Sequence, residues 1–111
     1  MKIRKQQIDE IMAIIIEEKE ANLSKSEHFK ELVLQEVNAG RRKLIISFVN
    51  VDYIDSSFLG ALVAILKSLL PLNGKLVLFG MNGDILNLFQ LTRLDKIFTL
   101  KNGLEDALKE F

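Results

Sequence analysis

The sequence lacks cysteine and tryptophan and has one proline and one histidine among its 111 residues. Without cysteine the chain forms no disulfide, thiolate metal site or cysteine nucleophile, which is in keeping with a reducing compartment. The 15 basic and 15 acidic side chains give no net charge, so no positive field attracts nucleic acid or anionic lipid. We therefore expect a fold that depends on packing and a protein with neither a nucleic-acid nor a membrane partner.

The sequence also lacks any segment typical of secretion or of a membrane span. Residues 1–10 mix charged and apolar side chains instead of forming the apolar core of a signal peptide. The longest nearly apolar stretch, residues 58–72, contains Lys67 and is shorter than the roughly 20 residues that a transmembrane helix needs. Because no linker-like stretch interrupts the chain, we expect one cytoplasmic domain over residues 1–111.

The hydrophobic pattern alternates strands and helices after an opening hairpin. The expected strands cover residues 1–7, 11–17, 44–49, 75–79 and 97–100. The expected helices begin at a Ser24–Glu27 capping box, at Ser57, at Asp84 and at an Asn102 cap. This order predicts an α/β fold with a mixed, mostly parallel sheet of about four to five strands and about four helices.

The polar side chains that can carry chemistry concentrate in residues 50–60, NVDYIDSSFLG, between a predicted central strand and a long apolar helix. In such sheets, ligands collect beyond the carboxyl ends of the strands. Asp55 or Ser56 is suited to capping the helix. The same helix start would stabilise a phosphate on Ser56, which would add about −1.5 to −2 charges close to Asp52 and Asp55. Capping and phosphorylation are compatible, and the residues alone leave both open.

The motif DSSFLG, followed by ALVAIL and then GKLVLFG, resembles the STAS domain of bacterial anti-sigma-factor antagonists over nearly the whole chain. The resemblance implies a single STAS-like domain with Ser56 as phosphoacceptor and Ser57 as the second choice. It implies that the unphosphorylated protein binds a GHKL-type serine-kinase anti-sigma factor, which then releases its sigma factor. Phosphorylation by that kinase would break the complex, and a PP2C-type phosphatase would reset it.

Three residues depart from the family pattern. Phe58 stands where the family usually has glycine, and Arg93 stands at another position where glycine is common. Asn22 replaces a carboxylate expected near the switch. We expect Asp55 to organise the turn before the helix and Asn22 to lie close to it.

The helix after the serines carries two apolar lines. One line, which includes Leu59 and Leu62, is predicted to face the core, and Phe58, Ala61 and Ile65 form the other. If the second line is exposed, it forms a partner-docking surface together with Ser57, Leu59 and Gly60. If the helix is covered on all sides, the second line is core instead.

An enzyme is the less favoured alternative. The chain has no G-x-S-x-G motif and no phosphate-binding glycine loop. Its one histidine, His28, has no evident catalytic partner. We therefore expect no catalytic residue, no cofactor and no metal site. A constitutive STAS scaffold or regulatory subunit without a phosphoswitch is the alternative binding function, and self-association stays open.

Overall fold

A five-stranded mixed sheet forms the centre of the computed structural model, which describes all residues 1–111. Its strands lie in the order β1 (Ile3–Ile8), β2 (Ile11–Ile16), β4 (Lys43–Ser47), β6 (Lys75–Phe79) and β7 (Thr99–Lys101). β1 pairs antiparallel with β2 across the turn at Asp9, which has a φ of 53°. The remaining neighbours are parallel, and this confirms the predicted α/β fold.

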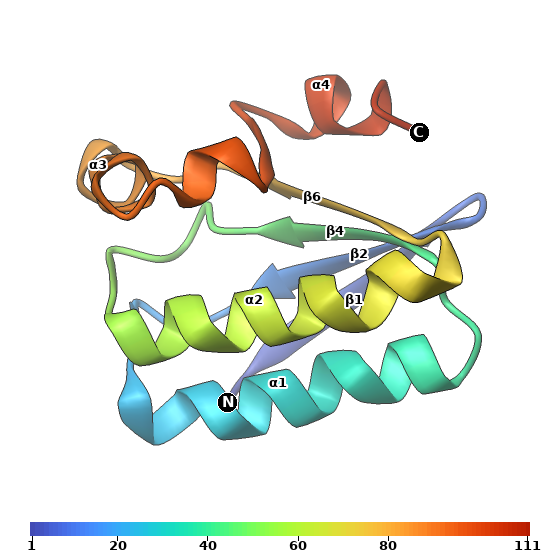
Figure 1. Ribbon diagram of the computed structural model, residues 1–111, viewed down its shortest axis with the longest axis horizontal. Helices are drawn as coiled ribbons and strands as arrows, with labels where there is room; N and C mark the ends of the chain where they lie inside the picture. Colours follow the sequence, from blue (N-terminus) through green and yellow to red (C-terminus); the bar gives the residue numbers. More distant parts are fainter.

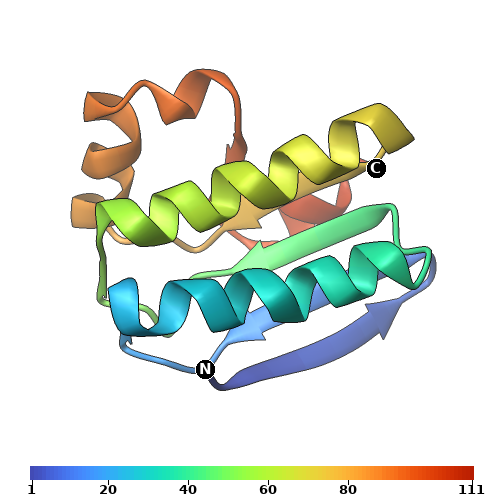
Figure 2. The ribbon, with the colours of Figure 1, turned by 60° about the horizontal axis from the view of Figure 1, so that its bottom comes forward.

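Four helices cover the sheet unequally. Helices α1 (Leu23–Asn38) and α2 (Ser56–Leu69) lie side by side on one face, and the short α4 (Leu104–Leu108) lies on the other (Figures 1 and 2). Helix α3 (Gly83–Leu91) lies at one end of the sheet, close to the start of α2 (Figure 2). Two short 3-10 turns follow α2 and α3, at Leu70–Leu72 and Leu94–Lys96. None of the helices has the length and apolar character that crossing a membrane requires.

The main core lies between the sheet and the layer of α1 and α2. Phe58 at the start of α2 is fully buried. Its ring centroid lies 4.8 Å from that of Phe29 on α1 and 6.4 Å from that of Phe48 beyond β4. These aromatic contacts fix where α2 begins relative to α1 and the sheet. A second, smaller cluster under α4 includes Ile45, Val77 and Ala107.

The structure contains a second, two-stranded sheet that periodicity does not predict. β3 (Glu20–Ala21) pairs in parallel with β5 (Tyr53–Ile54). Elements of two residues are too short to show an alternation of apolar and polar side chains. Their pairing brings the start of α1, directly after β3, next to the start of α2, directly after β5.

Two of the predicted helix caps are wrong. Helix α1 begins at Leu23 with Asn22 in the cap position, and the Ser24 hydroxyl donates to Asn22 Oδ1 at 2.7 Å instead of capping the backbone. Helix α4 begins after Gly103, and no side chain caps it. In both places a sequence pattern that fits a cap is displaced by one or two residues from the observed helix end.

Candidate functional site

Asp55 connects the starts of two helices. It occupies the N-cap of α2, where its Oδ1 accepts the backbone N–H of Phe58 at 3.0 Å and the hydroxyl of Ser57 at 2.6 Å. Its Oδ2 accepts the backbone N–H of Leu23, the first residue of α1, at 2.8 Å. One carboxylate therefore satisfies backbone donors of two helices that would otherwise be free.

These hydrogen bonds act on the acidity of Asp55. The Ser57 hydroxyl, and after it the N–H groups of Phe58 and Leu23, hold the pKa of the Asp55 carboxyl below its usual range, against the opposing effect of burial. Donors that bond the ionised form favour it over the neutral acid. Asp55 is therefore a fixed anion within the turn.

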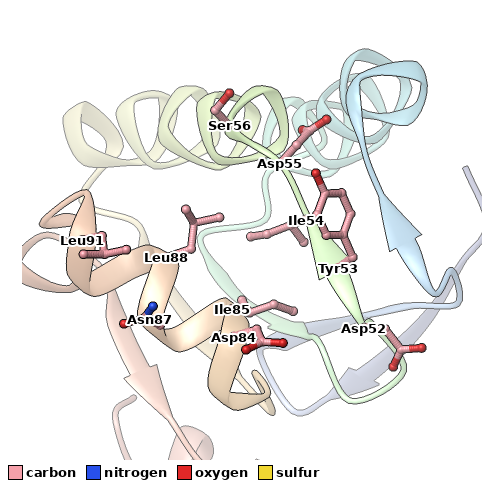
Figure 3. Close-up of a pocket in the computed structure, with 10 residues that line it drawn as sticks. All are labelled: Asp52, Tyr53, Ile54, Asp55, Ser56, Asp84, Ile85, Asn87, Leu88 and Leu91. Carbon is pink, nitrogen blue, oxygen red and sulfur yellow. The ribbon is translucent and has the colours of Figure 1, made fainter.

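The two adjacent serines differ in accessibility. Ser56 is exposed and its hydroxyl makes no hydrogen bond to the protein, whereas Ser57 is half-buried and its hydroxyl is bonded to Asp55. Figure 3 shows the Ser56 side chain directed outward from the start of α2. Of the two, only Ser56 therefore presents a free hydroxyl to solvent.

Asn22 lies in the same cluster as Asp55. It directly precedes Leu23, whose N–H bonds Asp55, and its backbone carbonyl accepts the N–H groups of Lys25 and Ser26 at 3.0 Å. Its side-chain oxygen is bonded by the Ser24 hydroxyl. The structure thus brings Asn22 and Asp55 together although 33 positions separate them in the sequence.

Of the two alternatives for the second apolar line on α2, the structure shows the buried one, so this line is not a docking surface. Phe58 and Ile65 are 0% exposed and Ala61 is 6% exposed, and Leu59 on the other line is buried as well. Because α2 packs against the sheet and α1 together, both apolar lines face the core (Figure 2). Among the residues expected to form a docking surface, only Gly60 is exposed and Ser57 half-buried.

Three apolar side chains that the sequence pattern did not single out are exposed near Ser56. Leu23 at the start of α1 is 72% exposed, Tyr53 in β5 is 54% exposed and Leu91 at the end of α3 is 74% exposed. Leu91 lies two positions after the buried Phe89, so it falls off the apolar stripe of α3. That offset is the one sequence signal that could have identified it.

A groove of about 520 Å³ lies next to Ser56 (Figure 3). One wall includes Tyr53, Ile54 and Ser56, and the other includes Ile85, Leu88 and Leu91 of α3. No group of three or more histidine, cysteine or carboxylate side chains is arranged to hold a metal ion. The site is therefore an open surface with one free serine hydroxyl, several exposed apolar side chains and a neighbouring groove.

Comparison with known proteins finds relatives that cover nearly the whole chain. The sequence profile of the STAS domain matches residues 2–107. A candidate anti-sigma factor antagonist of Thermotoga maritima is 32% identical over 104 residues, which cover 93% of this chain and 91% of the relative. The crystal structure described as a candidate antagonist of the same organism superposes with a TM-score of 0.89 at 28% identity, and covers 97% of this chain and 92% of that one.

Two further comparisons extend this result. The anti-sigma-B factor antagonist of Listeria monocytogenes is 41% identical over 59 residues, which cover 53% of this chain and 52% of the relative. The Bacillus cell fate determinant SpoIIAA in its phosphorylated form has the same fold, with a TM-score of 0.75 at 16% identity, and covers 98% of this chain and 97% of that one. The resemblance predicted from the sequence is thereby confirmed, and the relatives are regulatory binding proteins, not enzymes.

Proposed function

Because the chain belongs to the STAS domain family of anti-sigma factor antagonists, we propose that phosphorylation of Ser56 controls its binding to a serine-kinase anti-sigma factor. The unphosphorylated protein binds this kinase, of the GHKL type, in the cytoplasm, and the sigma factor is released. The kinase then transfers the γ-phosphoryl group of ATP to Ser56 Oγ, and ADP and a proton are released. A PP2C-type phosphatase hydrolyses the phosphoserine and restores the binding form.

The accessibility of the Ser56 hydroxyl carries this proposal. An acceptor hydroxyl must reach the active site of another protein, and Ser56 is exposed and free of hydrogen bonds within the chain. Ser57 does not meet this condition because its hydroxyl is half-buried and bonded to Asp55. Ser56 is therefore the acceptor that the local geometry supports.

The physical effect of the phosphate follows from its surroundings. Phosphorylation replaces a neutral hydroxyl by about −1.5 to −2 charges. The backbone N–H of Phe58 already bonds Asp55, so the phosphate gains little from this donor and stands beside a fixed carboxylate. A partner that covers the exposed Leu23 and Tyr53 would have to remove water from that charge, and this desolvation opposes binding.

The comparisons support the proposal by analogy. The Listeria relative is named an anti-sigma-B factor antagonist. SpoIIAA, a protein of the same fold, has been solved in an unphosphorylated and in a phosphorylated form. Both facts describe those proteins, and they make the phosphoswitch the first function to test here.

The decisive experiment is phosphoryl transfer followed by intact mass spectrometry. Each serine-kinase anti-sigma factor of the source genome is incubated with ATP and Mg²⁺ and with the wild type, Ser56→Ala or Ser57→Ala. We expect one kinase to add a single phosphoryl group to the wild type and to Ser57→Ala, and none to Ser56→Ala. If no kinase phosphorylates the wild type, the phosphoswitch is refuted and a constitutive scaffold becomes the better interpretation.

A further inference from the structure

The groove beside Ser56 is held open by hydrogen bonds within the chain. Asn82 caps α3 through Oδ1, which accepts the N–H of Ile85 at 2.9 Å. Its Nδ2 donates to the backbone carbonyl of Asp52 at 3.0 Å. One side chain thus ties the start of α3 to the segment before β5. Because both walls of the groove are fixed in this way, a ligand would enter a space that already exists.

Apolar side chains line both walls of the groove. Ile54 and Ile85, on opposite walls, are only 3% and 2% exposed, and Leu88 on the α3 wall is partly buried. Leu91 and Tyr53 stand on opposite sides of the opening and are mostly exposed (Figure 3). Covering these two side chains would remove apolar area from water, which favours association.

The charge around the groove has one sign. Asp52, Asp55 and Asp84 line it, and no lysine, arginine or histidine does. The negative charge of Asp55 is stabilised by three hydrogen bonds within the chain. The carboxylates of Asp52 and Asp84 are exposed and form neither an ion pair nor a side-chain hydrogen bond. In Figure 3, Asp52 and Asp84 lie at the end of the groove opposite Ser56.

From this arrangement we propose that the groove receives an apolar segment of the partner protein that carries a lysine or arginine side chain. The apolar side chains of the segment lie between Tyr53 and Leu91, and its cation lies beside Asp52 and Asp84. This proposal rests on the function proposed above, because the same partner then covers Ser56 and the groove. The attraction and the repulsion then act at different ends of the groove. The partner's cation pairs with Asp52 and Asp84 at the end away from Ser56, and a phosphate on Ser56 would have to lose its water at the opposite end.

A peptide experiment tests the groove without the kinase. Two short amphipathic peptides, one of leucine and lysine and one of leucine and glutamate in the same order, are titrated into the isotope-labelled protein. Amide shifts are followed by NMR. We expect the lysine peptide to shift amides of residues 52–56 and 84–91 and the glutamate peptide to leave them unchanged. Equal shifts with both peptides, or shifts centred elsewhere, would refute the proposal.

Charge-reversal variants make the same titration quantitative. Asp84→Lys should weaken binding of the lysine peptide about tenfold. Glu105→Lys is the matched control, because Glu105 also lies in the first turn of a helix, but on α4. This control should bind the peptide as the wild type does. Leu91→Ser is a second variant, for use if Asp84→Lys does not give the spectrum of a folded protein. It removes an exposed apolar side chain of the groove and should also weaken peptide binding about tenfold.

The kinase that phosphorylates the wild type provides the second measurement. Asp84→Lys and Leu91→Ser should weaken its complex about tenfold, whereas Glu105→Lys and Leu70→Ser should not; Leu70 is 60% exposed at the far end of α2. Normal kinase binding by both groove variants would refute the groove and keep the phosphoswitch. Peptide binding in the groove without any kinase that phosphorylates Ser56 would refute the phosphoswitch and keep the groove.

Discussion

Replacing Asp55 by alanine tests whether one carboxylate holds the starts of α1 and α2 together. The substitution removes the cap of α2, which costs about 1 kcal/mol. It also removes the acceptor of the Leu23 N–H at 2.8 Å. Leu23 is 72% exposed, so water partly replaces that bond and the further cost is about 1 kcal/mol. We expect Asp55→Ala to lower the free energy of unfolding by about 2 kcal/mol in all.

Equilibrium urea denaturation with a fluorescence or circular dichroism readout measures this change. Asp55→Asn retains an acceptor oxygen but not the charge, and it should lose less than Asp55→Ala. Asp84→Ala is the matched control, because Asp84 also lies at a helix start but makes no hydrogen bond through its side chain. This control should stay within about 0.5 kcal/mol of the wild type. A loss below about 0.5 kcal/mol for Asp55→Ala would refute the bridging role of the carboxylate.

Three further predictions concern pH, the core and the backbone. In the folded protein the pKa of Asp55 is lowered from 3.8, so ionisation of this carboxyl stabilises the fold at neutral pH. The difference in unfolding free energy between the wild type and Asp55→Asn should be constant above about pH 5, and it should shrink in urea titrations as the pH falls through the lowered folded-state pKa. Phe58→Ala should cost about 3–5 kcal/mol in calorimetric or urea unfolding, because the ring is fully buried against Phe29 and Phe48; a cost near 1 kcal/mol would contradict its assignment to the core. Arg93→Gly should raise the free energy of unfolding in urea by about 0.5–1 kcal/mol, because Arg93 has a φ of 61° that glycine adopts without strain. If the variant is less stable than the wild type, the Arg93 side chain stabilises the fold by more than the strain of its backbone destabilises it.

The sequence predicts the fold well because most elements have a strong local signal. The run Ile14 to Ile16 and the apolar segment 44–49 predict buried strands of the central sheet, and both strands are found there, although the second ends at Ser47 and Val49 is exposed. The DSSFLG motif is sufficient to select Ser56 and Asp55 as candidate site residues. The prediction is accurate here because each of these features depends on neighbours in the sequence.

The details of the site depend on contacts that no local pattern contains. The hydrogen bond from Leu23 to Asp55 spans 32 positions and requires the pairing of β3 with β5. The burial of Ile65 depends on whether α1 covers the second side of α2, and a helix with apolar residues on two sides has the same pattern in either case. The groove depends on where α3 ends relative to the start of α2. These features follow from tertiary packing, and for this reason the exposed apolar surface lies elsewhere than the helical pattern predicts.

The burial of Phe58 also explains how this chain accommodates an aromatic ring where its family usually has glycine. A large side chain next to Ser56 would hinder a kinase if it shared the same face of α2. The ring instead lies inside the core, 4.8 Å from Phe29, while the neighbouring Ser56 is exposed. Successive residues of a helix point about a quarter turn apart, so two positions separate the two side chains onto different faces. The Phe58 ring therefore contributes to the packing of α2 against α1 and leaves the approach to the Ser56 hydroxyl open.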